Sequence, residues 1–150
     1  MVKKRRACIF ISGTGTNLRS IIKNSRDYNF PININLIITN KKSAMGIKYA
    51  KKFNIPYLVI DKYKEKFEKY ALKELRDKKI KLLCLAGFMK ILSKTFVRNF
   101  NGNIINIHPS LLPKFKGLNT FKRVLSAKEK MTGCTVHYVN EKLDNGKTIV

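Results

Sequence analysis

The sequence predicts an α/β protein built on a doubly wound, mostly parallel sheet with helices on both faces. Short apolar runs bounded by turn residues alternate with segments whose apolar residues recur at helical spacing, as strands and helices do in parallel βαβ units. The first apolar run ends in a glycine turn that leads into a helix, which is typical of the start of such a sheet. A length of 150 residues suits one domain with a single core.

The first strand is expected at residues 7–11, where Ala-Cys-Ile-Phe-Ile is a continuous apolar run closed by Ser-Gly, as in a strand buried on both faces. Leu18, Ile21 and Ile22 then fall at helical spacing, so a helix follows the turn. The same alternation predicts the other elements of the parallel unit, which are strands at 34–39, 57–60 and 82–86 and helices at 44–53 and 64–78.

The second part of the chain is less regular. Gly87 and Phe88 break the alternation, and residues 89–100 read as an interrupted helical segment. The later elements are an apolar strand at 104–108, a short helix at 121–127, an alternating strand at 135–139 and a turn at 143–146. We find no internal repeat or linker, and we therefore expect a single domain over residues 1–150.

The composition is strongly basic. Lys and Arg total 32 against 9 Asp and Glu, a formal net charge of +23. Such a charge favours anionic partners. The cations are nevertheless spread over the expected helices and loops, and a surplus of Lys, Asn and Ile is typical of an A+T-rich coding sequence. We therefore attribute to the charge an effect on solubility and on the electrostatic steering of ligands, and we do not expect a nucleic-acid partner.

The sequence favours a cytoplasmic protein without a membrane partner. No apolar run approaches the roughly 20 residues of a membrane helix, and the basic residues 3–6 precede a run too short for a signal peptide. Cys8, Cys84 and Cys134 lie in apolar runs and form no Cys-x-x-Cys pair. We expect buried thiols, with no disulfide framework and no metal site.

Asn106 and His108 are the first candidates for chemistry. They lie two residues apart in an apolar strand, so both side chains project from one face. Pro109 restrains His108 and places the pair at the strand end, where open α/β sheets bind their ligands. A lone histidine there more often caps the strand. Asp144, before Asn-Gly, is by itself an ordinary turn former, and His137 in an alternating strand is better explained as structural.

A second candidate is the glycine loop, which comprises Gly13, Thr14, Gly15, Thr16 and Asn17. Glycines there can bring backbone amides close to a ligand, and the following helix start offers unpaired N–H groups. The third glycine of the dinucleotide fingerprint is replaced by Leu18, so NAD is not expected, and the Walker pattern is also unmet. A monophosphate ester fits best, with a plain tight turn as the alternative.

Taken together, the motifs resemble the folate-dependent formyltransferase family. The segment His-Pro-Ser-Leu-Leu-Pro from His108 to Pro113 marks the whole family, whereas the loop Ser-Gly-Thr-Gly-Thr-Asn-Leu at 12–18 resembles the phosphoribosylglycinamide formyltransferases of purine biosynthesis. Leu-Ala-Gly-Phe-Met-Lys-Ile-Leu at 85–92 and Leu-Asp-Asn-Gly at 143–146 also match. The resemblance runs over essentially the whole chain and implies a Rossmann-like formyltransferase fold.

The resemblance also implies an activity and a set of site residues. The activity is transfer of formyl from 10-formyltetrahydrofolate, a cosubstrate, to the amine of 5-phosphoribosylglycinamide, without a metal. Asn106, His108 and Asp144 are the implied catalytic residues, and Gly13 to Asn17 would hold the substrate phosphate. The implied folate-binding residues are Lys64, Met89, Lys90, Ile91, Leu92, Asn106, Asn140, Glu141, Lys142, Leu143 and Asp144.

Two departures from the family pattern are visible. Asn119 stands where the family usually has His, and family members continue beyond the position of Val150 with further contacts to the ribonucleotide. We therefore expect an uncovered sheet edge or pocket wall, with self-association or low stability as the result. Two rival functions stay open: another folate enzyme, either formyltetrahydrofolate hydrolase or methionyl-tRNA formyltransferase, and a basic nucleic-acid-binding protein.

Overall fold

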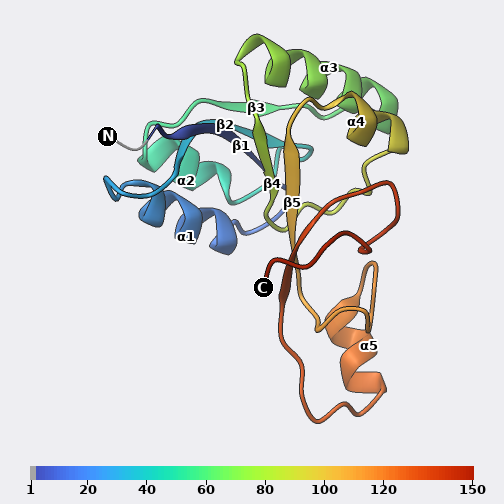
Figure 1. Cartoon of the computed structure of the whole chain (residues 1–150). Coiled ribbons are helices and arrows are strands. Elements are labelled where there is room, and N and C mark those ends of the chain that lie inside the picture. Colours follow the sequence, from blue (N-terminus) through green and yellow to red (C-terminus); the bar gives the residue numbers. More distant parts are fainter. Residues whose placement is uncertain (1–2) are drawn as a thin grey trace.

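The computed structural model describes residues 3–150, which form one six-stranded sheet in the order β3-β2-β1-β4-β5-β6 (Figure 1). The strands are β1 (Arg5–Ile11), β2 (Ile32–Thr39), β3 (Tyr57–Val59), β4 (Leu82–Leu85), β5 (Asn103–His108) and β6 (Thr135–Tyr138). The first five strands run parallel, and β6 pairs antiparallel to β5. This confirms the predicted mostly parallel sheet.

Five helices accompany the sheet within residues 3–150. They are α1 (Thr16–Ser25), α2 (Ile47–Lys52), α3 (Lys64–Asp77), α4 (Lys94–Asn99) and α5 (Thr120–Ser126). α1 and α2 cover one face, where Leu18 and Ala50 pack with Ile9. α3 and α4 cover the other face, where the rings of Phe67 and Phe96 lie 5.6 and 6.1 Å from that of Phe10. The double winding predicted from sequence is confirmed.

Two predicted helices are shorter than expected. The segment at 44–53 becomes helical only from Ile47, because the preceding residues form turns and the Gly46 N–H donates to the Gly13 carbonyl at 3.0 Å. The segment at 89–100 becomes helical only from Lys94, because the Ser93 hydroxyl caps α4 by accepting the Phe96 N–H at 3.0 Å. Residues 89–92 are therefore an irregular loop after β4, not part of a helix.

The strand order places the glycine loop at a topological switch point. The chain winds outward from β1 through β2 to β3, and then crosses back to β4 on the other side of β1. The loops after β1 and β4 thus start from neighbouring strands and are bonded to each other, since the Ser12 N–H donates to the Gly87 carbonyl at 3.2 Å. Open α/β sheets bind their ligands at such a point.

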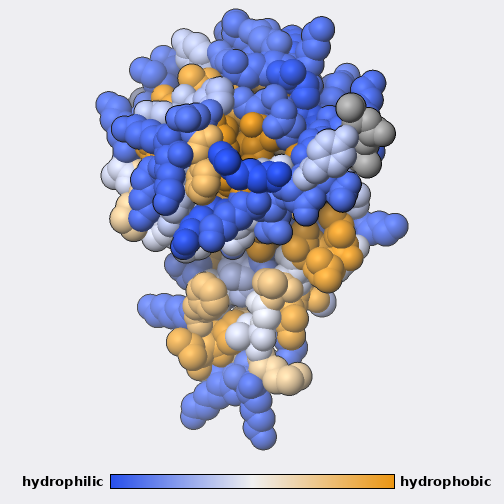
Figure 2. Space-filling model, turned by 90° about the vertical axis from the view of Figure 1, so that its left-hand side faces the viewer, coloured by the Kyte–Doolittle hydropathy of each residue, from blue (hydrophilic) through white to orange (hydrophobic). Residues whose placement is uncertain are grey.

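The segment around α5 projects from the sheet (Figure 1). Figure 2 shows hydrophobic side chains gathered on this projecting part, whereas the body around the sheet is mostly hydrophilic at its surface. Its exposed apolar side chains include Leu118, Phe121, Leu125 and Met131. Beside it, residues 147–150 pair with the outer edge of β6, where the Tyr138 N–H donates to the Lys147 carbonyl at 2.9 Å. Self-association stays a prediction.

The expectation of three buried thiols is correct for Cys8 and Cys84 and wrong for Cys134. Cys134 lies in an irregular segment before β6 begins, so its apolar neighbours in sequence do not form a covered strand. Burial raises the pKa of the Cys84 thiol to about 12 and that of Cys8 well above its usual value. Both buried thiols are therefore protonated core residues at neutral pH.

Candidate active site

Three segments meet at the carboxyl edge of adjacent parallel strands. They are the glycine loop after β1, the 89–92 loop after β4 and the end of β5 with Asn106 and His108. The register aligns Asn106 with Leu85 of β4 on one side and with His137 of β6 on the other. The long loop after β6 returns Asp144 to the same place. The fold thus gathers residues that lie far apart in the sequence.

One cluster contains Asn106, His108 and Asp144, the three residues that the resemblance implies to be catalytic. Asp144 Oδ2 lies 3.4 Å from His108 Nδ1, and Asn106 Nδ2 lies 3.5 Å from Asp144 Oδ1. Asp144 adopts a left-handed conformation with φ of 43°, and its Oδ2 also accepts the Gly117 N–H at 2.8 Å. His108 is 4% exposed. Asp144 can therefore form the turn and place its carboxylate beside His108 at the same time.

The contacts that two histidines make in this cluster were not predicted. His108 Nε2 lies 2.9 Å from the Phe115 carbonyl oxygen, so the ring faces an acceptor at each nitrogen. His137, which the sequence suggested to be only structural, lies with Nε2 3.5 Å from Asp144 Oδ1 and 3.3 Å from Asn106 Nδ2. Its Nδ1 lies 2.8 Å from the Tyr138 carbonyl oxygen, which fixes the ring. His137 thus positions the carboxylate from the side opposite His108.

The electrostatics of the cluster favour an ionised Asp144. Burial opposes ionisation, but the hydrogen bond with His137, the Gly117 N–H and the nearby His108 together hold the pKa of Asp144 below its ordinary value. The hydrogen bond with Asp144 is in turn the main reason why the pKa of His137 is raised, against the effect of burial. A carboxylate and a readily protonated imidazole therefore lie side by side.

We expect the Asp144–His137 pair to stabilise the fold most at mildly acidic pH. The contribution of His137 is fully present below its unfolded pKa of 6.5 and is lost as the pH rises through its raised folded pKa. The contribution of Asp144 is present above its unfolded pKa of 3.8 and is lost as the pH falls through its lowered folded pKa. His137→Gln should therefore lower the free energy of unfolding more at about pH 5 than at about pH 8.5. Urea titrations at both values measure this, and an equal loss at both would contradict it.

The glycine loop packs closely against the backbone of Gly46. Gly15 has φ of 76°, and a Cβ built on it would lie 2.6 Å from the Gly46 Cα. Gly15 is also the N-cap of α1, and no side chain caps the helix start. The first N–H groups of α1 lack partners within the helix and can receive an anion. Thr14, Thr16 and Asn17 are exposed beside them.

Ser12 joins the glycine loop to its two neighbouring loops. Its hydroxyl donates to Asn40 Oδ1, at the end of β2, at 2.6 Å and accepts the Met89 N–H at 2.8 Å. Ser12 and Asn40 are 3% and 5% exposed, so the bond between them is shielded from water. The hydroxyl therefore fixes the spacing between the glycine loop and the 89–92 loop. The sequence gives no sign of this contact.

We expect Ser12→Ala to lower the free energy of unfolding by about 2 kcal/mol, because it leaves the buried Asn40 side chain and the partly buried Met89 N–H without their partner. The KM for a ligand that spans both loops should rise as well, since their spacing is no longer fixed. Thermal denaturation and steady-state kinetics measure the two effects. Ser126→Ala, at an exposed position at the end of α5, is the matched control. A Ser12→Ala protein as stable as that control would contradict the prediction.

Some predicted folate-binding residues have exposed side chains, and the side chains of others already make contacts within the protein. Met89, Ile91 and Leu143 are 56%, 50% and 47% exposed, whereas Leu92 packs against the core. The Glu141 carboxylate is held by Arg98 in two bonds of 2.7 Å, which ties the 140–144 loop to α4.

Two polar members of the set, Asn140 and Lys90, make hydrogen bonds to nearby backbone groups. Asn140 Oδ1 accepts the Lys142 N–H at 2.9 Å and orders the turn before Asp144. Lys90 Nζ donates to the Lys62 carbonyl at 3.3 Å, which brings the start of α3, with the exposed Lys64, close to the 89–92 loop. Among residues 3–150 no group of three acidic, His or Cys side chains could hold a metal ion, and no helix has the length and hydropathy to cross a membrane.

Comparison with known proteins gives consistent matches. The formyl transferase family model matches residues 5–150. The chain is 39% identical over 152 residues to phosphoribosylglycinamide formyltransferase of Haemophilus influenzae, covering 97% of this chain and 71% of that protein. It is 42% identical over 154 residues to the trifunctional purine biosynthetic protein adenosine-3 of Drosophila melanogaster, of which it spans 11%, while 99% of this chain is covered.

A solved structure agrees with these relatives. The crystal structure of phosphoribosylglycinamide formyltransferase from Anaplasma phagocytophilum superposes with a TM-score of 0.93 at 40% identity, covering 99% of this chain and 70% of that one. The residues matched by the family model include Asn106, His108, His137 and Asp144. The chain therefore belongs to the formyl transferase family and, within it, to the phosphoribosylglycinamide formyltransferases.

Proposed function

We propose that the protein transfers a formyl group from 10-formyltetrahydrofolate to the amine of 5-phosphoribosylglycinamide, a step of purine biosynthesis. The observation that carries the proposal is the cluster of Asn106, His108 and Asp144 beside an uncapped glycine loop, in a chain of this family. The family membership supports a folate-derived formyl donor. Residues 1–150 act as one formyltransferase domain in this proposal, and the cytoplasmic location stays a prediction.

The reaction exchanges one carbon–nitrogen bond for another. The substrate amine attacks the formyl carbon, its bond to that carbon forms, and negative charge develops on the formyl oxygen. The bond from the formyl carbon to N10 of the folate then breaks; the attacking amine loses a proton and N10 gains one. Donors placed around the formyl oxygen lower the barrier because they stabilise charge that exists only in the transition state.

Asn106 and His108 are the proposed donors to the formyl oxygen. The Asn106 amide lies at the strand end with its Nδ2 near Asp144, and the His108 ring lies on the same face of β5. Both ring nitrogens of His108 face an acceptor within the protein, and that of Nε2 is the Phe115 carbonyl. The formyl oxygen must replace this carbonyl before Nε2 can donate a hydrogen bond to the substrate. Substrate binding therefore includes a shift of the segment that carries Phe115.

Asp144 is proposed to favour the protonated form of His108 and to help relay that proton. Its pKa is held low despite burial, so it is ionised at neutral pH and can stabilise a proton on the neighbouring imidazole. The glycine loop receives the substrate phosphate through Gly13 to Asn17 and the start of α1. Met89, Ile91 and Leu143 offer apolar surface to the folate ring, with Lys64 and Lys90 at the edge of this surface.

A turnover assay with and without the acceptor tests the proposal. We expect consumption of 10-formyltetrahydrofolate only when 5-phosphoribosylglycinamide is present. Release of formate without an acceptor would instead assign the protein to hydrolysis, and formylation of methionyl-tRNA would assign it to the tRNA branch of the family. Nucleic-acid affinity that falls steeply with salt, without any use of folate, would favour the binding-protein alternative.

A further inference from the structure

A basic hollow lies at the amino edge of the sheet, where the parallel strands β1, β4 and β5 begin. It has a volume of about 530 Å³ and is lined by Lys3, Lys4, Arg5, Arg6, Lys79, Lys81, Asn101, Gly102 and Asn103. The candidate active site lies at the carboxyl edge of the same strands. Because β1 is seven residues long, roughly 20 Å separate the two edges. The amino-edge hollow is therefore distinct from the site proposed for formyl transfer.

Backbone contacts hold the three lining segments together. The Lys81 N–H donates to the Arg6 carbonyl at 3.2 Å, and the Asn103 N–H donates to the Lys81 carbonyl at 3.0 Å. A Cβ built on Gly102 would lie 2.8 Å from the carbonyl carbon of Lys81, so this close approach requires glycine. The amino-edge hollow is thus built on the hydrogen-bonded beginnings of the strands.

The lining of the amino-edge hollow carries positive charge without a counter-charge. Six of its nine described residues are Lys or Arg and none of the nine is acidic, whereas Lys and Arg make up 32 of all 150 residues. Among residues 3–150, no ion pair involves any of these six cations. The basic composition of the whole chain therefore does not by itself account for the cluster.

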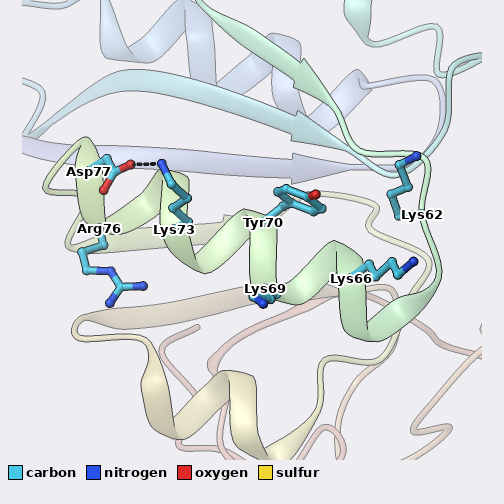
Figure 3. A pocket seen from close by; sticks show the side chains of 7 residues that line it. All are labelled: Lys62, Lys66, Lys69, Tyr70, Lys73, Arg76 and Asp77. Carbon is cyan, nitrogen blue, oxygen red and sulfur yellow. Dashed lines mark hydrogen bonds and ion pairs between the residues drawn. The ribbon is translucent and has the colours of Figure 1, made fainter.

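A second basic hollow, along α3, has a different construction (Figure 3). Its cations, among them Lys66 and Lys69, follow one helix, and its lining includes the acid Asp77, which pairs with Lys73 at 2.6 Å. The cations of the amino-edge hollow come instead from separate segments of the chain and line a common space. A compact ligand can contact several of them at once.

The backbone positions two of the amino-edge cations. Arg6 Nε donates to the Lys78 carbonyl at 2.8 Å, which orients the planar guanidinium. Lys79 follows the C-cap of α3 with φ of 53°, at a position where glycine is the usual residue. A cation thus lies beside the hollow where backbone sterics favour another residue. Lys4 contributes less, since its Nζ donates to the Asp27 carbonyl at 2.7 Å.

We propose that the amino-edge hollow binds an oligophosphate anion, namely a chain of two or three linked phosphates, either free or carried by a nucleotide. Such a chain concentrates several negative charges in a small volume, which suits cations that line one space. Guanidinium groups bind phosphate oxygens through paired hydrogen bonds, and Arg5 and Arg6 both line the hollow. None of the nine described lining residues is aromatic, so the hollow offers no side chain on which a base could stack. The phosphates are therefore the group that is recognised.

Isothermal titration of the full chain with inorganic tripolyphosphate, in magnesium-free buffer of low ionic strength, tests the proposal. We expect binding that weakens as salt screens the charges, and affinity for orthophosphate at least about tenfold lower. ATP and GTP should each bind within about threefold of tripolyphosphate, because the base makes no contact. No binding of tripolyphosphate, or a nucleotide that binds about tenfold more tightly than tripolyphosphate, overturns the proposal.

Two double variants locate the bound anion. Arg5→Gln combined with Lys81→Gln removes two exposed cations from the amino-edge hollow and should weaken tripolyphosphate binding about tenfold. Lys66→Gln combined with Lys69→Gln removes the same charge from α3 and should change the affinity by less than about twofold. Equal losses in the two variants overturn the proposal, because they would show only an effect of total charge. Undiminished affinity in the Arg5→Gln/Lys81→Gln protein overturns it as well, since the anion would then bind elsewhere, for example at the glycine loop.

Lys79→Gly separates the loss of charge from any loss of folding. Glycine relieves the positive φ while it removes a cation, so this variant should be at least as stable as the unaltered protein and still bind tripolyphosphate about threefold more weakly. Urea denaturation and the same titration measure both quantities. Undiminished affinity in this stable variant overturns the proposal. So does tighter binding of an oligonucleotide that carries the same number of phosphates, which would assign the hollow to nucleic acid. None of these outcomes depends on formyl transfer.

Discussion

Replacing Asp144 with Asn is expected to lower kcat by about 10²–10⁴-fold, the loss typical of removing a positioned proton-transfer group. Asn keeps an oxygen for the Gly117 N–H and tolerates the positive φ of this position, so the turn should stay intact. What is lost is the negative charge that faces His108 at 3.4 Å and His137 at 3.5 Å. Steady-state kinetics with both substrates at saturation measure the effect.

Two further variants show whether Asp144 and His108 act as one unit. His108→Ala should lower kcat at least as far as Asp144→Asn, and the double variant should lose little more than His108→Ala alone. Asp61→Asn, which removes an exposed carboxylate 3.9 Å from Lys42, is the control and should keep normal turnover. If the two single losses multiply in the double variant, or if Asp144→Asn keeps near-normal kcat, Asp144 is a turn residue and the proposed catalytic set shrinks to Asn106 and His108.

Gly15→Ala is expected to reduce the free energy of unfolding by about 2–4 kcal/mol and to abolish binding of the phosphorylated substrate. The added Cβ would lie 2.6 Å from the Gly46 Cα, where the contacting atom is backbone and cannot rotate away. The residue would also keep a φ of 76°, which is unfavourable for alanine. Relief of the clash must move the loop that carries the first N–H groups of α1. Urea denaturation and titration with the ribonucleotide measure the two effects.

Gly13→Ala is the matched control in the same loop. A Cβ at Gly13 meets no atom within 4 Å, and its φ is not in the left-handed region. This variant should change the free energy of unfolding by less than about 0.5 kcal/mol. If Gly15→Ala and Gly13→Ala prove equally stable, the close crossing of Gly15 and Gly46 is not a constraint on the loop.

The sequence by itself determined the parallel sheet and the approximate place of the candidate site. Continuous apolar runs at β1 and β4 predicted strands covered on both faces, and the alternation with amphipathic segments implied helices on both sides. The period of two along β5 placed Asn106 and His108 on one face before any contact was known. These features depend on neighbours in the sequence, which is why they could be predicted.

Only the tertiary structure decided which residues, distant in the sequence, complete the candidate site and which residues are exposed. His137 joins Asn106 because the antiparallel register of β5 and β6 sets them opposite each other. Ser12 joins Asn40 and Met89 because three strands end at the same edge of the sheet. Cys134 is exposed because its segment ends before β6 begins. Each of these facts depends on register and strand order, and local periodicity carries no information about either.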